Sequence, residues 1–313
     1  MVRWPAHSSL IMPTLVRLSS LLVAILLTAA QPAAAPAVSF GYPDGVAVDA
    51  AGLVYVVDTD NATVEKVSPA GEVTPFSAGT LAYPTGVAVG ATGTVYVADA
   101  GSHSIVQVSP AGEISTLAHN RELIFPAAVA VDVAGNVYVA DSGSEPGSGT
   151  VQKISPHGAR ATLAKGLNKP AGIAVSTQGM VYVADTGNNT VRQIDPDGHS
   201  TVLAATFNHP RGLAIDATGA LLVANTYDNN IRRVSPTGQV SLVAEGFNFP
   251  AGLATDPSGI VYVTDTGTSS VRKIGTDGQV SLLAGGAASG PAPAVPLLAD
   301  SSASSHADTT KHK

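Results

Sequence analysis

Cysteine is absent from this 313-residue chain, which excludes disulfide bonds, thiolate metal ligands and a cysteine nucleophile. Charge is also scarce, because Asp, Glu, Lys and Arg together make up only 12% of the residues. After residue 37 the balance is acidic: 14 basic and 23 acidic residues give a net charge of −9, and no cluster of Lys and Arg occurs. Such a surface repels phosphate backbones, so we expect no nucleic-acid partner.

The chain also lacks an apolar run long enough to span a bilayer comfortably. Residues 18–30 form an apolar stretch of 13 residues, whereas a transmembrane helix needs about 20. The stretch follows Arg17 and precedes Ala35 and Ala37, which fit the A-x-A pattern of a signal-peptide cleavage site. We therefore predict that residues 1–37 are a signal peptide. The mature protein would be secreted or held in the cell envelope, without a membrane span.

The rest of the sequence repeats itself about every forty residues. A proline precedes each copy of a run similar to G-V-A-V-D, and successive prolines are separated by 41, 42, 44, 40 and 40 residues. These prolines are Pro43, Pro84, Pro126, Pro170, Pro210 and Pro250. Six units of this length predict a propeller or a solenoid, in which neighbouring units bury each other's apolar faces.

Each unit divides into four short runs rich in Val and Ile. In the fifth unit they read GLAIDA, ALLVANT, IRRVSP and VSLVAEG, and we name them strands a to d. Turns of the D-x-x-G and S-P-x-G kind link a to b and c to d. Strand a is apolar on both faces and contains small residues, which suits a crowded axis, whereas strand d alternates with polar residues and suits a rim. The sequence therefore predicts an all-β fold, a six-bladed β-propeller of four-stranded antiparallel blades, over residues 38–286.

The recurring pattern P-x-G-V-A-V-D-x-x-G-x-V-Y-V-A-D-x-x-N-x-x-V resembles the NHL repeat over residues 43–286. Similar modules are extracellular sensor domains of actinobacterial receptor serine/threonine kinases, interaction domains of animal regulators, and the peptidyl-hydroxyglycine amidating lyases. The resemblance implies the propeller fold and leaves binding and catalysis both open. In the amidating lyases several histidines converge on the channel to hold zinc. Here only His209 is expected at the channel mouth, so we expect no metal and no other cofactor.

Polar residues that recur in every unit are expected to serve the blade. Strand b ends in an acidic or amide residue that could act in metal binding or acid–base chemistry, namely Asp58, Asp99, Asp141, Asp185, Asn225 and Asp265. Because one such residue occurs per blade, we expect these side chains to bond the amides of their own loop. The strand-b tyrosines are likewise expected to pack between blades, with Leu222 in the fifth unit.

Function is expected where the units differ, on the face that carries the d–a and b–c loops, which we call the looped face. Four aromatic residues directly precede the repeat proline and are either binding anchors or packing residues: Tyr42, Tyr83, Phe125 and Phe249. Lys169, His209 and Arg211, on adjacent units, form a candidate binding site for an anionic ligand group. Asp44 is a further candidate, and it could instead form an ion pair with Arg211.

Two b–c loops differ from their counterparts. The loop at 141–150 is four residues longer and rich in Gly and Ser, a composition typical of both functional lids and idle insertions. The loop NTYDNN, residues 225–230, brings Tyr227 and Asp228 beside Arg211 and is the stronger candidate. Because we expect Arg211 and Tyr227 on exposed loops, alanine at either position should leave the melting temperature nearly unchanged.

Three functional hypotheses follow. The leading one is a secreted, non-enzymatic, monomeric NHL propeller that binds a protein, peptide or glycan, or acts as a scaffold, through the looped face. The alternative is a lyase or hydrolase that uses His209, Arg211 and Tyr227, although no G-x-S-x-G, H-E-x-x-H, P-loop or EF-hand pattern occurs. The third is a purely structural envelope protein. Residues 287–313 are expected to be a disordered tail.

Overall fold

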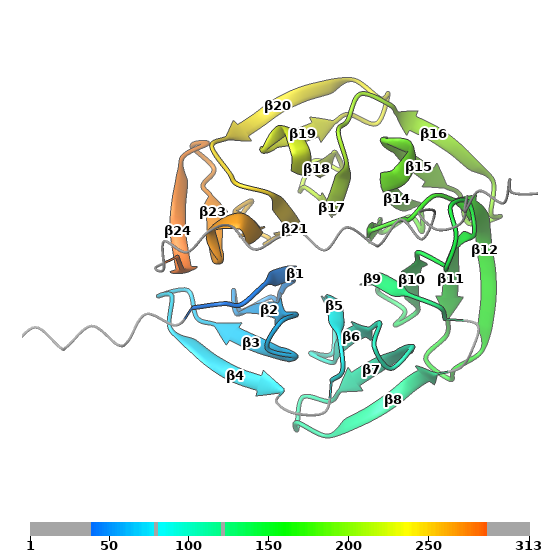
Figure 1. Cartoon of the computed structure of the whole chain (residues 1–313), viewed down its shortest axis with the longest axis horizontal. Coiled ribbons are helices and arrows are strands. Elements are labelled where there is room, and N and C mark those ends of the chain that lie inside the picture. Colours follow the sequence, from blue (N-terminus) through cyan, green and yellow to red (C-terminus); the bar gives the residue numbers. More distant parts are fainter. Residues whose placement is uncertain (1–38, 78–80, 120–122, 287–313) are drawn as a thin grey trace, which may run out of the picture. The chain divides into compact units, whose positions relative to one another are not determined.

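The chain folds into six four-stranded antiparallel sheets arranged around a common axis (Figure 1). This computed structural model describes residues 39–77, 81–119 and 123–286. The predicted signal peptide and the predicted C-terminal tail lie outside the described residues. Within the described ranges, no helix has the length and apolar character needed to cross a membrane. The predicted fold class, a six-bladed β-propeller, is confirmed.

The first three blades each run outward from the axis in sequence order, with strand a innermost and strand d at the rim (Figure 1). Blade 1 consists of β1 (Pro43–Val48), β2 (Val54–Asp58), β3 (Thr63–Val67) and β4 (Val73–Ser77). Blade 2 consists of β5 (Pro84–Val89), β6 (Val95–Asp99), β7 (Ser104–Val108) and β8 (Ile114–His119). Blade 3 consists of β9 (Pro126–Val131), β10 (Val137–Asp141), β11 (Gly149–Ile154) and β12 (Arg160–Leu167).

The last three blades have the same order and add a short 3₁₀ turn between strands b and c. Blade 4 consists of β13 (Gly172–Val175), β14 (Val181–Asp185), η1 (Thr186–Asn188), β15 (Thr190–Ile194) and β16 (Ser200–Ala204). Blade 5 consists of β17 (Pro210–Ile215), β18 (Leu221–Asn225), η2 (Thr226–Asp228), β19 (Asn230–Val234) and β20 (Val240–Glu245). Blade 6 consists of β21 (Pro250–Thr255), β22 (Val261–Asp265), η3 (Thr266–Thr268), β23 (Ser270–Ile274) and β24 (Val280–Gly285).

Local sequence explains both the hairpins and the burial of the strands. In the first a–b turn, Asp49 Oδ1 accepts hydrogen bonds of 2.9 Å from the backbone N–H groups of Ala51 and Leu53. Gly52 in the same turn has a φ of 80°, which favours glycine. The b strands such as β2 are buried along their whole length, because neighbouring blades cover both faces, whereas rim strands such as β20 are partly exposed.

The hydrophobic core lies between adjacent blades. Tyr55 of blade 1 packs with Val87 and Val95 of blade 2, and Leu222 of blade 5 packs with Leu253 of blade 6. The prediction that the strand-b aromatic positions, together with Leu222, pack between blades is therefore confirmed. Because each blade buries its apolar face only against its neighbours, the ring is expected to fold as one unit.

Blades 6 and 1 close the ring without sharing a strand. Phe40 precedes β1 outside any strand, is only 1% exposed, and packs in one cluster with Tyr262 of blade 6. Across the same boundary the Thr266 hydroxyl donates a 2.6 Å hydrogen bond to the backbone oxygen of Pro43, and Thr264 donates one of 2.6 Å to that of Asp44. Side-chain packing and buried hydroxyl groups therefore close the ring.

Candidate functional site

The repeat prolines begin the strands at the looped face, and the residues before them are held in two different ways. In blades 1–3 the strand-b carboxylate accepts hydrogen bonds from the two residues that precede the proline. Asp58, for example, accepts bonds of 3.0 Å from the N–H groups of Gly41 and Tyr42. In blades 4–6 the residue before the proline instead has a positive φ of 48–57°; these residues are Lys169, His209 and Phe249. The six positions before the prolines are therefore not equivalent around the ring.

Asparagine side chains of the preceding blade support the second arrangement in blades 5 and 6. Asn189 Oδ1 accepts a 2.8 Å hydrogen bond from the His209 N–H, and Asn229 Oδ1 accepts one of 2.9 Å from the Phe249 N–H. The strand-b residue then holds the amide one residue earlier, as Asn225 does for Asn208 at 2.6 Å. The N-x-P triplets of the last three units are the sequence signal for this difference.

The polar residues that end the b strands serve the blade, through amides of their own loop in three blades and through a further set of backbone amides in all six. Asp141 does bond its own loop, accepting from the Gly143 N–H at 3.1 Å. The bonds to backbone amides that recur in all six blades come instead from the connection before strand a, 16 or 17 residues earlier in the chain. The antiparallel a–b pairing brings the end of strand b beside the start of strand a, so those amides are within reach. The expectation of own-loop amide partners therefore holds in blades 1, 3 and 4, where Asn61 and Asn188 donate from their side chains and Gly143 from its backbone, but it misses the backbone amides that recur in every blade.

Arg211 and Asp44 form an ion pair between blades 5 and 1, which resolves one alternative left open by the sequence. Arg211 Nη2 lies 2.7 and 2.9 Å from the two Asp44 carboxylate oxygens, and Nη1 lies 3.3 Å from the Tyr42 hydroxyl. The two side chains are only 19% and 13% exposed. Arg211 belongs to β17, so the expectation that it sits on an exposed loop is wrong.

Burial and mutual attraction set the electrostatics of this pair. Burial raises the pKa of the Asp44 carboxyl, and the Arg211 guanidinium partly opposes that rise. Burial alone would lower the pKa of Arg211, but the charge of Asp44 and the Tyr42 hydroxyl raise it above its ordinary value. Because the guanidinium contacts both carboxylate oxygens, we take Asp44 as ionised and Arg211 as charged at neutral pH.

His209 and Tyr227 form a stacked pair beside this ion pair. Their ring centroids lie 4.2 Å apart with an interplanar angle of 4°, and the Tyr227 and Phe249 rings are nearly perpendicular, with centroids 5.9 Å apart. Burial lowers the pKa of His209 to about 4, and the nearby charges of Arg211 and Lys169 add to that decrease. The imidazole is therefore uncharged at neutral pH and offers the site no positive charge.

These side chains line a pocket of about 210 Å³, which we call the mouth pocket. Eight of the ten residues predicted from the sequence line it: Tyr42, Asp44, Tyr83, Phe125, Lys169, His209, Arg211 and Tyr227. Asp228 and Phe249 lie outside its lining. Asp228 instead accepts hydrogen bonds from the side-chain amides of Asn208 and Asn225, at 2.9 and 2.7 Å. A second cavity of about 300 Å³, lined by the six a strands, also includes Asp44 and Arg211, so the ion pair borders both.

Sequence reasoning missed three hydroxyl residues that also line the mouth pocket: Thr85, Ser142 and Thr186. Each donates a buried hydrogen bond of 2.7–2.8 Å to the backbone oxygen of the next blade's repeat proline. The available signal is a Thr or Ser directly after the strand-b carboxylate, as in Ser142 and Thr186. In blade 2 that position is Ala100, and Thr85 makes the equivalent bond from strand a.

The long loop of blade 3 takes little part in the mouth pocket. It covers residues 142–148 between β10 and β11, and of its residues Ser142 lines the pocket. The rest of the loop is held by hydrogen bonds between its own residues. The Glu145 N–H donates a 3.0 Å bond to Ser148 Oγ, and the Ser148 hydroxyl donates a 2.7 Å bond to the Glu145 backbone oxygen. The described structure thus favours the loop of Tyr227 over this insertion as part of the site.

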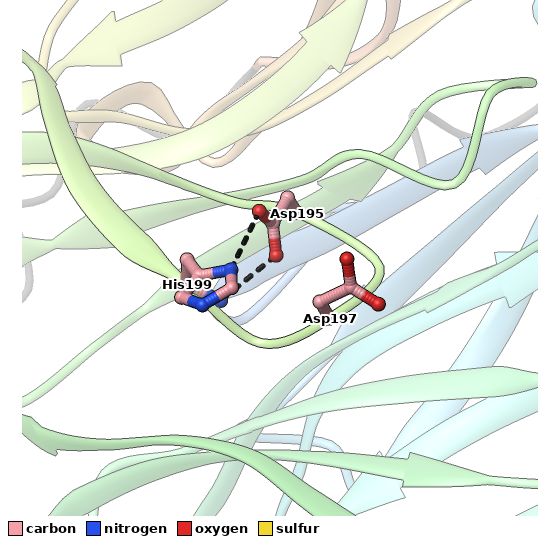
Figure 2. Close-up of side chains that lie close together, drawn as sticks. All are labelled: Asp195, Asp197 and His199. Atoms are coloured by element: carbon pink, nitrogen blue, oxygen red, sulfur yellow. Dashed lines mark hydrogen bonds and ion pairs between the residues drawn. The ribbon is translucent and has the colours of Figure 1, made fainter.

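One group among the described residues could supply three metal ligands, and it lies on the turn between β15 and β16: Asp195, Asp197 and His199. Figure 2 shows contacts between His199 and Asp195 and none that reaches Asp197. His199 is 79% exposed, and nothing else in the turn indicates a bound ion. The mouth pocket itself offers one imidazole, His209, and one carboxylate already paired with Arg211. This donor set does not fit a zinc centre with several histidines.

Comparisons with known proteins agree with this architecture. The family description "SMP-30/Gluconolactonase/LRE-like region" matches residues 84–245, and the description "NHL repeat" matches residues 40–66 and 247–274. No curated protein matches the chain in sequence. A likeness to the sensor domains of kinases stays a prediction.

Similar solved structures share the fold at low sequence identity. A gluconolactonase from Xanthomonas campestris is 19% identical, with a TM-score of 0.66 and coverage of 77% of this chain and 86% of that one. An inactive virginiamycin B lyase from Staphylococcus aureus, solved with quinupristin, is 15% identical, with a TM-score of 0.60 and coverage of 79% and 86%. A structure of a nidogen/laminin complex contains a chain that is 22% identical, with a TM-score of 0.65 and coverage of 73% and 90%. The first of the two family descriptions covers more than half of the residues, so the chain belongs to the SMP-30/gluconolactonase/LRE-like family, and its first and last blades match the NHL repeat.

Proposed function

We propose that this protein is a non-enzymatic propeller that binds a small organic ligand in the mouth pocket. The observation that carries the proposal is the concentration of rings in its lining, which includes Tyr42, Tyr83, Phe125, His209 and Tyr227. Pockets with aromatic walls and few free polar groups are typical of sites for small molecules. The volume of about 210 Å³ is below the ~300–1,000 Å³ typical of sites for drug-sized ligands, so we infer a ligand with a single ring system.

The polar groups of the pocket support binding over catalysis, because most already have partners. Thr85, Ser142 and Thr186 donate their hydroxyl protons to backbone oxygens. A nucleophile is activated by a base within hydrogen-bond reach. No hydrogen bond joins the His209 imidazole to any of these hydroxyls within the described residues, and Asp44 is bound to Arg211. The pocket therefore lacks an assembled nucleophile and base.

A second candidate function is catalysis in the same pocket, and the family match favours it. The chain shares its family description with gluconolactonases, and its fold with a lyase solved with quinupristin. His209 is the side chain that could accept a proton, since it is uncharged at neutral pH. Its pKa of about 4 makes it a weak base, because general bases work best with a pKa near the working pH. A protein, peptide or glycan partner on the looped face, and export from the cell, both stay predictions.

One experiment separates the two functions. The purified protein is mixed with gluconolactone and, separately, with quinupristin, and product formation is followed by pH-stat and by mass spectrometry. In parallel, NMR titrations with benzoate, benzamide and phenol follow the ring resonances of Tyr227 and His209. We expect ring-resonance shifts and no product above the uncatalysed rate. Turnover that disappears in His209→Gln would overturn the non-enzymatic proposal in favour of catalysis.

A matched pair of variants tests the location of the site. Tyr227→Ala should lower the melting temperature of the free protein only slightly, because this residue is 38% exposed and its removal costs two aromatic contacts, with His209 and Phe249. The same variant should lose the stabilisation that a bound aromatic probe gives the parent protein. Val133→Ala is the control, since Val133 is 76% exposed and lies outside the mouth pocket. Equal probe stabilisation in all three proteins would mean that the probe binds elsewhere.

A further inference from the structure

The charged groups of the mouth pocket leave one uncompensated positive charge. Asp44 and Arg211 neutralise each other at 2.7 Å, and burial together with nearby cations keeps His209 uncharged at neutral pH. Lys169 is half-buried in the lining and has neither a hydrogen bond nor an ion pair within the described residues. Burial raises the pKa values of the Tyr42 and Tyr83 hydroxyls, which therefore add no negative charge. The lining thus complements a ligand with a single negative charge.

Two pairs of rings in the lining, which we call its two aromatic walls, could contact that ligand. Lys169 directly precedes the repeat proline of blade 4, between the Phe125 position of blade 3 and the His209 position of blade 5 in ring order, and its charge acts on His209. One wall includes Tyr83 and Phe125, with centroids 6.3 Å apart, and the other is the stacked pair of His209 and Tyr227. Planar ligand rings gain more from such walls than puckered ones do, because aromatic contacts depend on the orientation of the rings.

The Thr and Ser hydroxyl groups of the lining cannot donate to a ligand, so the hydroxyls of Tyr42, Tyr83 and Tyr227 are the donors that the lining offers a sugar-like one besides Lys169. Thr85, Ser142 and Thr186 keep their protons in hydrogen bonds to proline carbonyls, so toward the pocket they offer oxygen lone pairs only. A polyhydroxylated ligand would bury several hydroxyl groups and needs donors as well as acceptors around them. Each buried hydroxyl left without a partner weakens binding. A carboxylate on an aromatic ring needs donors at one point only, and Lys169 supplies them.

We propose that the mouth pocket selects a planar aromatic monocarboxylate, with the ring between the two aromatic walls and the carboxylate on the Lys169 ammonium. This inference rests on the proposed binding function and names the chemical class of the ligand. Asp44 takes part indirectly, because by neutralising Arg211 it limits the pocket to one free positive charge.

The test compares four probes at pH 7 by calorimetry, with NMR of the Tyr227 and His209 rings to locate them: benzoate, benzamide, cyclohexanecarboxylate and gluconate. We expect benzoate to bind about tenfold more tightly than benzamide, as one charge-assisted hydrogen bond would give. We also expect benzoate to bind more tightly than cyclohexanecarboxylate, which is not planar, and than gluconate, which is polyhydroxylated. In Lys169→Met the preference for benzoate over benzamide should disappear while benzamide binding persists. The control Lys165→Met removes an exposed lysine outside the lining and should change neither the benzoate affinity nor the benzamide affinity.

The outcomes distinguish this inference from the function on which it rests. Benzamide or gluconate binding as tightly as benzoate, with shifts at Tyr227, would overturn the ligand class and leave the pocket as a binding site. Unchanged benzoate affinity in Lys169→Met would also overturn the class. If none of the four probes shifts the two rings up to its solubility limit, the proposed function itself fails.

Discussion

Replacing Asp44 with Asn should destabilise the ring substantially, because it leaves the Arg211 guanidinium mostly buried without a counter-charge. The substitution replaces the carboxylate, whose oxygens lie 2.7 and 2.9 Å from Arg211 Nη2, with a neutral amide that keeps one acceptor oxygen and places an NH2 group against the guanidinium. Breaking a fully buried pair costs about 3–5 kcal/mol, whereas exposed pairs contribute about 0–1 kcal/mol. With side chains 19% and 13% exposed, we expect a loss of roughly 3 kcal/mol, near the buried limit.

A double-mutant cycle with chemical denaturation measures this energy directly. Arg211→Met alone leaves Asp44 unpaired and should also destabilise, whereas the double variant should recover much of the loss, with a coupling energy of at least about 2 kcal/mol. In thermal melts, Asp44→Asn should lower the melting temperature by roughly 6–10 °C for a domain of this size. The control is Arg232→Gln, since Arg232 and Asp228 are 3.9 Å apart and 31% and 37% exposed. The reasoning would be refuted if the losses in free energy of unfolding of the two single variants simply added in the double variant. It would also be refuted if Asp44→Asn lost as little free energy of unfolding as Arg232→Gln.

Three further predictions concern single positions. His209 should titrate near pH 4 by NMR; because its unfolded pKa is near 6.5, stability should fall as pH decreases from about 6.5 to 4, and denaturation of His209→Gln should lack that component. Gly172→Ala should cost about 1–3 kcal/mol in a urea titration, because the new Cβ would overlap the backbone oxygen of Arg211; an unchanged midpoint would mean that the blades move apart freely. Thr266→Val should cost about 1–3 kcal/mol, because it leaves the buried Pro43 oxygen without its 2.6 Å partner, and a neutral result would show that this hydroxyl does not help to close the ring.

The sequence by itself determined the fold, because the fold depends on local patterns that recur six times. Val-rich runs bounded by turns such as D-A-A-G before Leu53 establish each hairpin within a few residues. The six repeat prolines, spaced 40 to 44 residues apart, establish the number of blades. Because each blade packs only against its neighbours, local patterns also predict the core, including Leu222 in the position of a tyrosine.

The site needed the tertiary structure, because its residues meet only when the ring closes. Asp44 and Arg211 are 167 residues apart in sequence, and no local rule decides whether they bind each other or a ligand. The charge of His209 depends on burial and on two cations, Arg211 of its own blade and Lys169 of the preceding blade. The Ser142 hydroxyl is bound to a proline carbonyl 28 residues away in the sequence. Sequence therefore placed most of the candidate residues on the face that carries the mouth pocket. Only the closed ring decided that Lys169 keeps a free charge, because burial and pairing are properties of the assembled blades.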